Sequence, residues 1–144
     1  MGGKEQENIV GNYSGQVQFA EGYHTDGKFY NIVTTEEATL DDVTTCTCLT
    51  LKIQVQKCNL IWGVYEYYNS LESEMEVDNF SGVRIDDNTW QIRDGEEVIT
   101  LVFSKCNKKV NFSLNSGNST THERYPGYFE LIDGCLKKCK TDCC

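Results

Sequence analysis

The chain has 144 residues, enough for one domain with a hydrophobic core of its own. Its 22 acidic residues outnumber its 13 lysines and arginines, which gives a formal net charge of −9. This charge argues against nucleic acids and anionic membranes as partners, because both attract clusters of basic side chains. No apolar run approaches the roughly 20 residues that cross a bilayer, so no membrane-spanning segment is predicted.

The N-terminal third has the least regular pattern. Residues 1–10 contain no apolar signal-peptide core, so we expect them to be the mature start of a secreted chain from which the signal has been removed. The run "NYSGQVQF" is typical of a strand. Residues 21–33 are interpreted as a loop with a second possible strand, and residues 34–42 as a loop or one short helical turn.

From residue 46 the pattern alternates with the period of two that is typical of strands. The run "CTCLTLKIQV" places Leu49, Leu51, Ile53 and Val55 on one face, and its two cysteines on the opposite face. Residues 59–68 are apolar on both faces and rich in aromatic and β-branched residues, which predicts a central strand.

The second half of the chain predicts further strands and turns. In "EMEVDNF" acids alternate with apolar residues, and we expect the acidic run 72–78 to be a solvated face before a turn at Ser81-Gly82. Trp90 and Ile92 share a face of a hairpin that turns at Asp94-Gly95 and returns over residues 98–104. Strands over 109–114 and 127–132 flank a loop rich in Gly, Ser and Asn.

These seven or eight short strands with hairpin spacing predict a single all-β domain. An up-and-down antiparallel β-barrel of about eight strands is the first interpretation, because closing the sheet removes its edges, and a β-sandwich is the alternative. A barrel of about eight strands has room inside for one small ligand.

The cysteines and sequons indicate an extracellular protein. The cysteines are even in number and the only histidines are His24 and His122, which favours disulfides over a zinc site, so no metal is predicted. Eight cysteines allow 105 full pairings. We predict disulfide bonding for Cys46, Cys48, Cys58, Cys106, Cys135, Cys139, Cys143 and Cys144, and N-glycosylation at Asn12, Asn79, Asn111 and Asn118.

Several features in the last hundred residues follow one another in a recognisable order. A strand bears cysteines, "TCTCLTL", and a hairpin turns at Asp94-Gly95 into "VITLVFSKC". A polar loop then leads to the strand "GYFELI" and the segment "CLKK". In this order and spacing the chain resembles the salivary lipocalins of ticks, the group that includes histamine-binding proteins. It differs from them at Ile132, where the family has Trp, and at Leu101, where it has an acid.

The resemblance implies a lipocalin-like barrel over about 9–132 and a C-terminal tail, 133–144, held to the outer wall by disulfides. It implies that Cys106 pairs with Cys135 and that Cys46 or Cys48 pairs with the terminal cluster, which leaves Cys58 to take one more cysteine. It also implies a ligand site inside the barrel. The predicted ligand-binding residues are Glu130, Trp90, Trp62, Tyr65, Tyr128 and Ile132.

Glu130 is the residue on which the site depends. Alternation leaves two arrangements open: either Phe129 and Leu131 fill the core while Glu130 is solvated, or Glu130 points inward with Tyr128 and Ile132. The family pattern implies the second. A buried carboxylate must take up a proton or meet a cation, which a ligand amine, Arg84 or Arg93 could supply.

We therefore expect a secreted, monomeric protein that sequesters a small host mediator, first of all a biogenic amine such as histamine or serotonin. The alternatives are a scavenger of leukotrienes or fatty acids, and a protein-binding inhibitor of complement or another host defence protein. No nucleophile motif, phosphate-binding loop or histidine-based constellation is present, so neither catalysis nor a cofactor is predicted.

Overall fold

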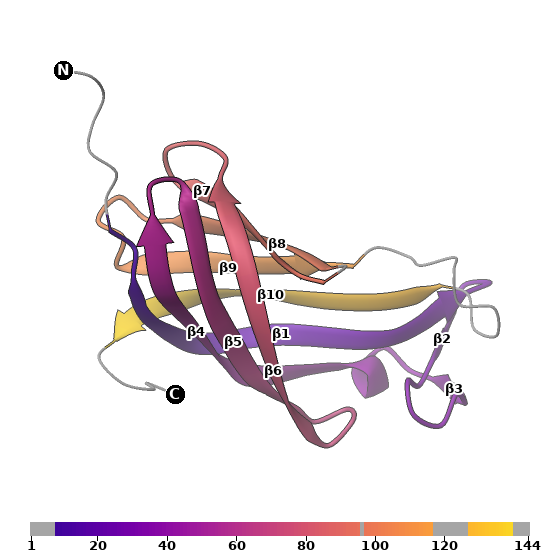
Figure 1. The fold of residues 1–144 in the computed structure, drawn as a ribbon. Coiled ribbons are helices and arrows are strands. Elements are labelled where there is room, and N and C mark those ends of the chain that lie inside the picture. The colour runs from indigo at the N-terminus through magenta and orange to yellow at the C-terminus, as the bar shows by residue number, and fades with distance from the viewer. Residues whose placement is uncertain (1–7, 96, 117–126, 140–144) are drawn as a thin grey trace.

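The fold is a closed antiparallel β-barrel (Figure 1). The computed structural model describes residues 8–95, 97–116 and 127–139. Hydrogen bonds between the last and first strands close the sheet, in a register from Asn12 opposite Cys139 to Tyr23 opposite Tyr128. The eight strands are, in spatial order, β1 (Gly11–Thr25), β4 (Thr44–Lys57), β5 (Leu60–Asn69), β6 (Glu74–Arg84), β7 (Thr89–Asp94), β8 (Glu97–Phe103), β9 (Lys109–Asn115) and β10 (Tyr128–Cys139). The predicted all-β barrel is confirmed.

A short excursion separates β1 from β4. It contains the strands β2 (Lys28–Tyr30) and β3 (Glu37–Ala38) and the 3-10 helix η1 (Asp41–Val43). The strand β2 pairs with the far end of β1, so the excursion extends the sheet beyond the barrel wall, as seen at the lower right of Figure 1. The second strand and the short helical turn predicted for this part of the chain are confirmed, whereas residues 21–25, predicted as part of a loop, continue β1.

The strand directions give the barrel two different ends. At one end, called here the packed end, lie the start of β1 and the turns around residues 58–59, 85–88 and 104–108. At the other, called here the acidic end, lie the turn around residues 70–73, the hairpin turn after Asp94, and the excursion through β2 and β3. The two ends differ in what fills the interior.

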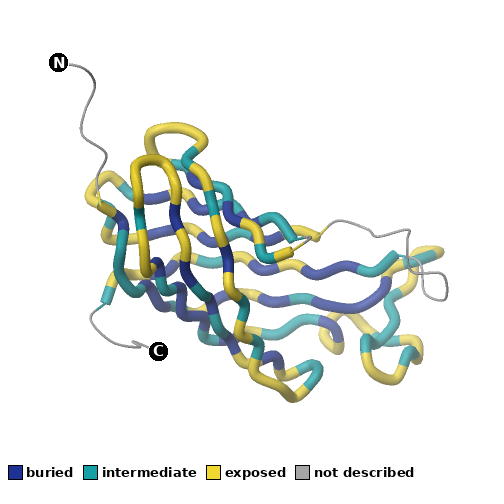
Figure 2. Tube along the Cα trace, in the orientation of Figure 1, coloured by how far each residue is buried: buried dark blue, intermediate teal, exposed yellow. Residues whose placement is uncertain are grey.

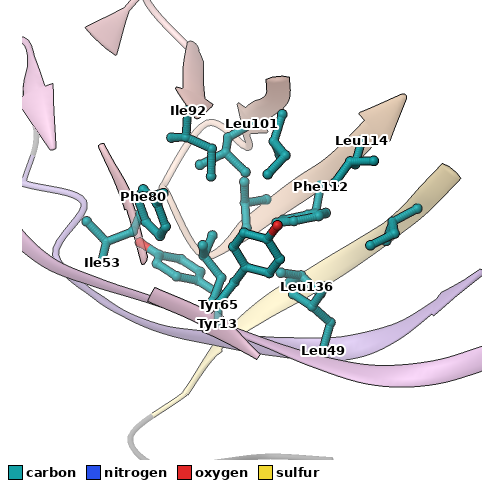
Figure 3. Close-up of a cluster of buried hydrophobic side chains, with 14 of the residues drawn as sticks. Tyr13, Leu49, Ile53, Tyr65, Phe80, Ile92, Leu101, Phe112, Leu114 and Leu136 are labelled. Carbon is teal, nitrogen blue, oxygen red and sulfur yellow. The ribbon is translucent and has the colours of Figure 1, made fainter. Parts of the chain in front are cut away.

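Alternation along each strand sends one row of side chains inward, and the tube in Figure 2 alternates between buried and exposed accordingly. The interior of the packed end and the middle of the barrel is a dense apolar core, part of which is drawn in Figure 3. Tyr13 lies within it, and its hydroxyl donates a hydrogen bond of 2.9 Å to the Ile9 carbonyl. The fully buried large residues are Tyr13, Tyr65, Phe19, Phe112, Leu49, Leu51, Ile53, Ile61, Ile92, Ile99, Leu101 and Leu114.

The predicted inward row of β4 is confirmed for Leu49, Leu51 and Ile53 but wrong for Val55, which is 52% exposed. The register with β5 shifts between Ile53 and Val55, so this is a β-bulge. A bulge inserts one extra residue, and the side chains beyond it therefore exchange faces. Val55 consequently points outward, beside Trp62 on β5.

The strand β6 reverses two expectations. Ser81 and Gly82 do not form a turn, because they pair with β5 on one side and with β7 on the other. The acids of this strand are not its solvated face either. Met75 and Val77 are each 57% exposed, whereas Glu76 and Asp78, which share the inward row with the buried Phe80, are only partly exposed. The barrel wall is therefore apolar outside and acidic inside along this stretch.

The disulfide framework is partly corrected. Cys48 and Cys139 each take part in a disulfide bond, but Cys46, Cys58, Cys106 and Cys135 are exposed free thiols. The predicted Cys106–Cys135 bond is wrong: Cys106 lies in the turn beyond the ends of β8 and β9, whereas Cys135 lies inside the ladder, opposite Asn111. Cys143 and Cys144 are outside the described residues.

We therefore expect Cys46, Cys58, Cys106 and Cys135 to react with iodoacetamide in the native protein, because their sulfur atoms are unbonded and solvent-accessible. Cys48 is the matched control, since it lies on the same face of β4 as Cys46 and should be labelled only after reduction. Peptide mass mapping identifies the labelled sites. Recovery of a peptide pair joined through Cys106 and Cys135 would contradict this assignment.

Candidate functional site

A cavity of about 350 Å³ opens inside the acidic end of the barrel. Its volume is at the lower end of the roughly 300–1,000 Å³ that small-molecule sites occupy. Five of its six lining residues are acids, and they come from four different strands. The lining residues are Tyr67 from β5, Glu76 and Asp78 from β6, Asp94 from β7, Glu97 from β8 and Glu130 from β10.

One wall of the cavity is formed by β1 and β10, where Tyr128 holds two carboxyl groups. The Tyr128 hydroxyl lies 2.8 Å from Glu21 Oε2 and 2.9 Å from Glu130 Oε2. Tyr67 Oη adds a longer contact of 3.4 Å to Glu130 Oε1. Glu21 is 5% and Glu130 is 7% exposed, so both carboxyl groups are removed from bulk solvent.

The opposite wall is formed by β6 and β7. The Tyr65 hydroxyl donates a hydrogen bond to Asp94 Oδ2. The same phenol also lowers the pKa of Asp78, although burial has the larger effect and raises it. Within the described residues, the second Asp94 oxygen, Oδ1, is buried and has no hydrogen-bond partner.

Burial raises the pKa of every carboxyl group that lines the cavity, because desolvation penalises the charged form. It raises the pKa of Glu76, Glu97 and Glu130 to about 7, with repulsion between neighbouring acids as a further cause, and those of Asp78 and Asp94 also rise. The pKa of Glu21 rises to about 8, first through burial and then through its hydrogen bond with Glu72. The four glutamates therefore titrate close to neutral pH.

No basic side chain compensates this charge in the described part of the chain. The ion pairs there join Lys28 to Glu37, Lys52 to Glu66 and Arg84 to Asp87, and none involves a carboxyl group of the cavity. Arg84 donates to the carbonyl oxygens of Asp86 and Asp87 at the packed end, and Arg93 is exposed on β7. Neither arginine neutralises Glu130, although both were candidates for this on sequence grounds.

The acidic lining continues toward the turn after β5. Asn69 Nδ2 lies 3.1 Å from Glu21 Oε1 and 3.0 Å from Glu72 Oε2, so one amide joins the cavity wall to the turn. Carboxyl oxygens of Glu72, Glu74 and Glu76 lie within 4.8 Å of one another. The acid cluster therefore extends from the cavity to the rim of the barrel.

Three of the predicted site residues do lie at this end. Glu130 points inward and lines the cavity, Tyr128 binds its carboxyl group, and Tyr65 binds Asp94 on the facing wall. Ile132 shares the inward row of β10 with Glu130 but is 1% exposed in the apolar core. The arrangement in which Glu130 is solvated is wrong, because the outward residue is Leu131.

Both tryptophans lie elsewhere. Trp90 points inward but belongs to the apolar core, opposite Arg84 and Leu101 near the packed end, and does not line the cavity. Trp62 is 42% exposed on the outer face of β5. The inward-facing residues of this strand are Ile61, Gly63, Tyr65 and Tyr67. The two tryptophans, predicted as ligand-binding residues, therefore do not line the cavity that contains Glu130.

Of the five acids that line the cavity, only Glu130 was predicted from the sequence. Glu97 supplies an acid just after the Asp94-Gly95 turn, four residues before Leu101, where none was expected. Glu76 and Asp78 were assigned to a solvated face. In the sequence, Met75 and Val77 alternate with Glu76 and Asp78, so one face of this strand had to be acidic and the other apolar. The pattern alone did not show which of the two faces points inward.

The outer surface carries other features that bear on the sequence predictions. A hollow of about 470 Å³ lies outside the barrel beside η1 and contains Leu40, Cys46 and Leu131. The sequon residues Asn79 and Asn111 are exposed, Asn12 lies in β1 and is partly exposed, and Asn118 and His122 are outside the described residues. No helix in the described ranges is long and apolar enough to cross a membrane.

Comparison with known proteins identifies no relative: no protein-family model matches the chain, and no curated protein resembles it in sequence.

Proposed function

We propose that this chain is a secreted carrier that sequesters a small cationic amine, such as histamine or serotonin, and thereby suppresses a host defence response. The observation that carries the proposal is the cavity at the acidic end, where five carboxyl groups converge and no described basic side chain pairs with them. The resemblance of the sequence to tick salivary lipocalins points to the same class of ligand.

Physical reasoning supports a cation as the occupant. Enclosing an unpaired carboxylate costs several kcal/mol in typical estimates, so the empty site holds protons near neutral pH. An ammonium group that enters can replace those protons and form charge-assisted hydrogen bonds with Glu130. The phenol ring of Tyr67, which lines the same cavity, offers a face for cation–π attraction of roughly 0.5–2 kcal/mol.

The same charge disfavours the fatty-acid and leukotriene alternative. Such ligands carry a carboxylate and a long apolar chain. The cavity would place that carboxylate among Glu76, Asp94 and Glu130, and the rest of the interior is filled by packed side chains (Figure 3). Electrostatic repulsion and lack of space both oppose binding.

A second candidate function, inhibition of a host protein through the outer surface, is favoured by one observation. Val55 and Trp62 form an outward cross-strand pair on β4 and β5, and Leu60 and Val83 form another on β5 and β6. All four are more than 40% exposed. Exposed apolar groups gathered in this way are typical of protein contact surfaces. Failure of every amine to bind would favour this function.

The amine hypothesis predicts that Glu130→Gln weakens binding by about tenfold or more, because a charge-assisted hydrogen bond is worth roughly 1.5–3 kcal/mol. Isothermal titration calorimetry with histamine and serotonin measures the effect. The matched control is Asp133→Asn, which removes an exposed, outward acid from the same strand and should leave affinity unchanged. No binding at micromolar ligand, or equal binding by Glu130→Gln and the unaltered protein, would sink the proposal.

A further inference from the structure

The two walls of the cavity repeat one arrangement. On the β1/β10 wall, the Tyr128 hydroxyl contacts both Glu21 and Glu130, at 2.8 Å and 2.9 Å. On the β6/β7 wall, the Tyr65 hydroxyl donates a hydrogen bond to Asp94, and the same phenol lowers the pKa of the neighbouring Asp78. In each case a single phenol stands between two carboxyl groups.

A phenol hydroxyl has one proton and can donate only one hydrogen bond. When both carboxyl groups of a pair are ionised, one of them therefore lacks the donor that it contacts in the structure. Each wall thus lacks one hydrogen-bond donor. Either a proton bound to a carboxyl group or the N–H of an external cation can supply it. The unpartnered, buried Oδ1 of Asp94 is a separate sign of the same deficit on the β6/β7 wall.

The two deficits lie across the barrel from each other. In the order β1-β4-β5-β6-β7-β8-β9-β10, closed by β10 against β1, the strands β4 and β5 separate β1 from β6, and β8 and β9 separate β7 from β10. Glu130 and Asp94 both line the same cavity from these facing walls. Because these carboxyl groups come from opposite walls, a ligand with two charged groups can pair with both walls.

We propose that the ligand is a linear diamine or polyamine, whose two terminal ammonium groups bind the Glu21–Tyr128–Glu130 and Asp78–Tyr65–Asp94 groups at the same time. This inference rests on the proposed function and specifies its ligand class. Two ammonium ends linked by a flexible apolar chain match two separated acid pairs, and the polymethylene segment crosses the space beside Tyr67. A second ammonium that binds within an already occupied cavity does so at high effective concentration, which raises the total affinity.

Calorimetry at about pH 8 tests the inference with putrescine, spermidine and n-butylamine, the last having the chain length of putrescine and one charge. We expect the two polyamines to bind at least about tenfold more tightly than butylamine. Glu130→Gln and Asp94→Asn should each reduce putrescine affinity to that of butylamine, while the outward control Asp133→Asn retains the difference. The comparison of putrescine with butylamine uses the unaltered protein, so it tests the inference even if a variant does not fold.

The outcomes separate this inference from the proposed function. If histamine, serotonin and butylamine bind as tightly as putrescine and Asp94→Asn changes nothing, the diamine inference is overturned and amine sequestration stands. If none of these amines binds, both the diamine inference and the proposed amine sequestration are overturned. A parallel titration with Ca²⁺ covers the other dication that clustered carboxylates accept, and calcium binding without diamine binding overturns the inference in favour of a metal site.

Discussion

The ligand-free protein is expected to melt at a clearly lower temperature at about pH 8.5 than at about pH 5.5. Burial raises the pKa of Glu21 to about 8 and those of Glu76, Glu97 and Glu130 to about 7, whereas an exposed glutamate in the unfolded chain has a pKa near 4.3. Between these values the folded state binds more protons than the unfolded state. Stability therefore falls as the pH rises through this window and is greatest near its acidic side.

The size of this change in stability depends mainly on the two most buried carboxyl groups, those of Glu21 and Glu130. Each unit of pKa difference corresponds to about 1.4 kcal/mol. Because the carboxyl groups interact with one another, we expect the buried pair to contribute on the order of a few kcal/mol in total rather than the sum of their separate shifts. At roughly 2–8 °C per kcal/mol for domains of about this size, the melting temperature should differ by 10 °C or so. The groups that face Glu130 and Glu21 inside the barrel are Tyr67, Asn69, Glu72, Glu76, Asp78, Asp94, Glu97 and Tyr128.

Calorimetric melting across this pH range measures the slope directly. The double variant Glu21→Gln and Glu130→Gln should make the slope shallower, because two of the four titrating glutamates become neutral amides, whereas Asp133→Asn on the outer face of β10 should leave it unchanged. A saturating cationic ligand should also reduce the slope, since it stabilises the ionised acids at high pH. A ligand-free protein that grows more stable from about pH 5.5 to 8.5 would contradict the inward, unpaired placement of these groups.

Substitution of Gly63 is the second change for which we expect a large effect. A Cβ atom at this position would lie 2.0 Å from the Lys52 carbonyl oxygen and 2.8 Å from Phe80 Cζ. The first contact is with backbone of the neighbouring strand, which cannot move without breaking the β4–β5 ladder beside its bulge. We expect Gly63→Ala to destabilise the fold by about 3 kcal/mol, the upper end of the 1–3 kcal/mol that overpacking commonly costs, because the closest contact is with backbone.

Chemical denaturation of purified Gly63→Ala measures this cost. The control is Gly27→Ala, where a Cβ meets no atom within 4 Å but the backbone φ of +75° is unfavourable for alanine. That variant should lose only about 1–2 kcal/mol. Equal stabilities for the two variants would show that the crowding around Gly63 is relieved at little cost, and would contradict the close approach of β4, β5 and Phe80.

The barrel itself was predictable from local pattern, and the acid site was not. Leu49, Leu51 and Ile53 form an apolar row opposite a row of polar residues, and such an apolar row is stable only when it faces the core. In β6 both rows are ambiguous, because Met75 and Val77 alternate with Glu76 and Asp78. Their directions were decided by pairing with β5 and β7, which places Phe80 in the core and fixes the parity of every other residue in the strand.

The sequence by itself determined the all-β class and most of the strands, because these depend on a two-residue period and on turn residues close in the chain; it left the direction of Glu130 and the closure of the sheet open. Tertiary structure alone decided that Asp78, Asp94 and Glu130 share one cavity and that Glu21 is joined to Glu130 through Tyr128. Sheet closure and the register of each strand bring them together, and both depend on contacts between residues far apart in the chain, such as Tyr128 and Glu21, which are 107 positions apart. Register is a cooperative property of the whole sheet, so no local pattern in the chain reveals where its charges meet.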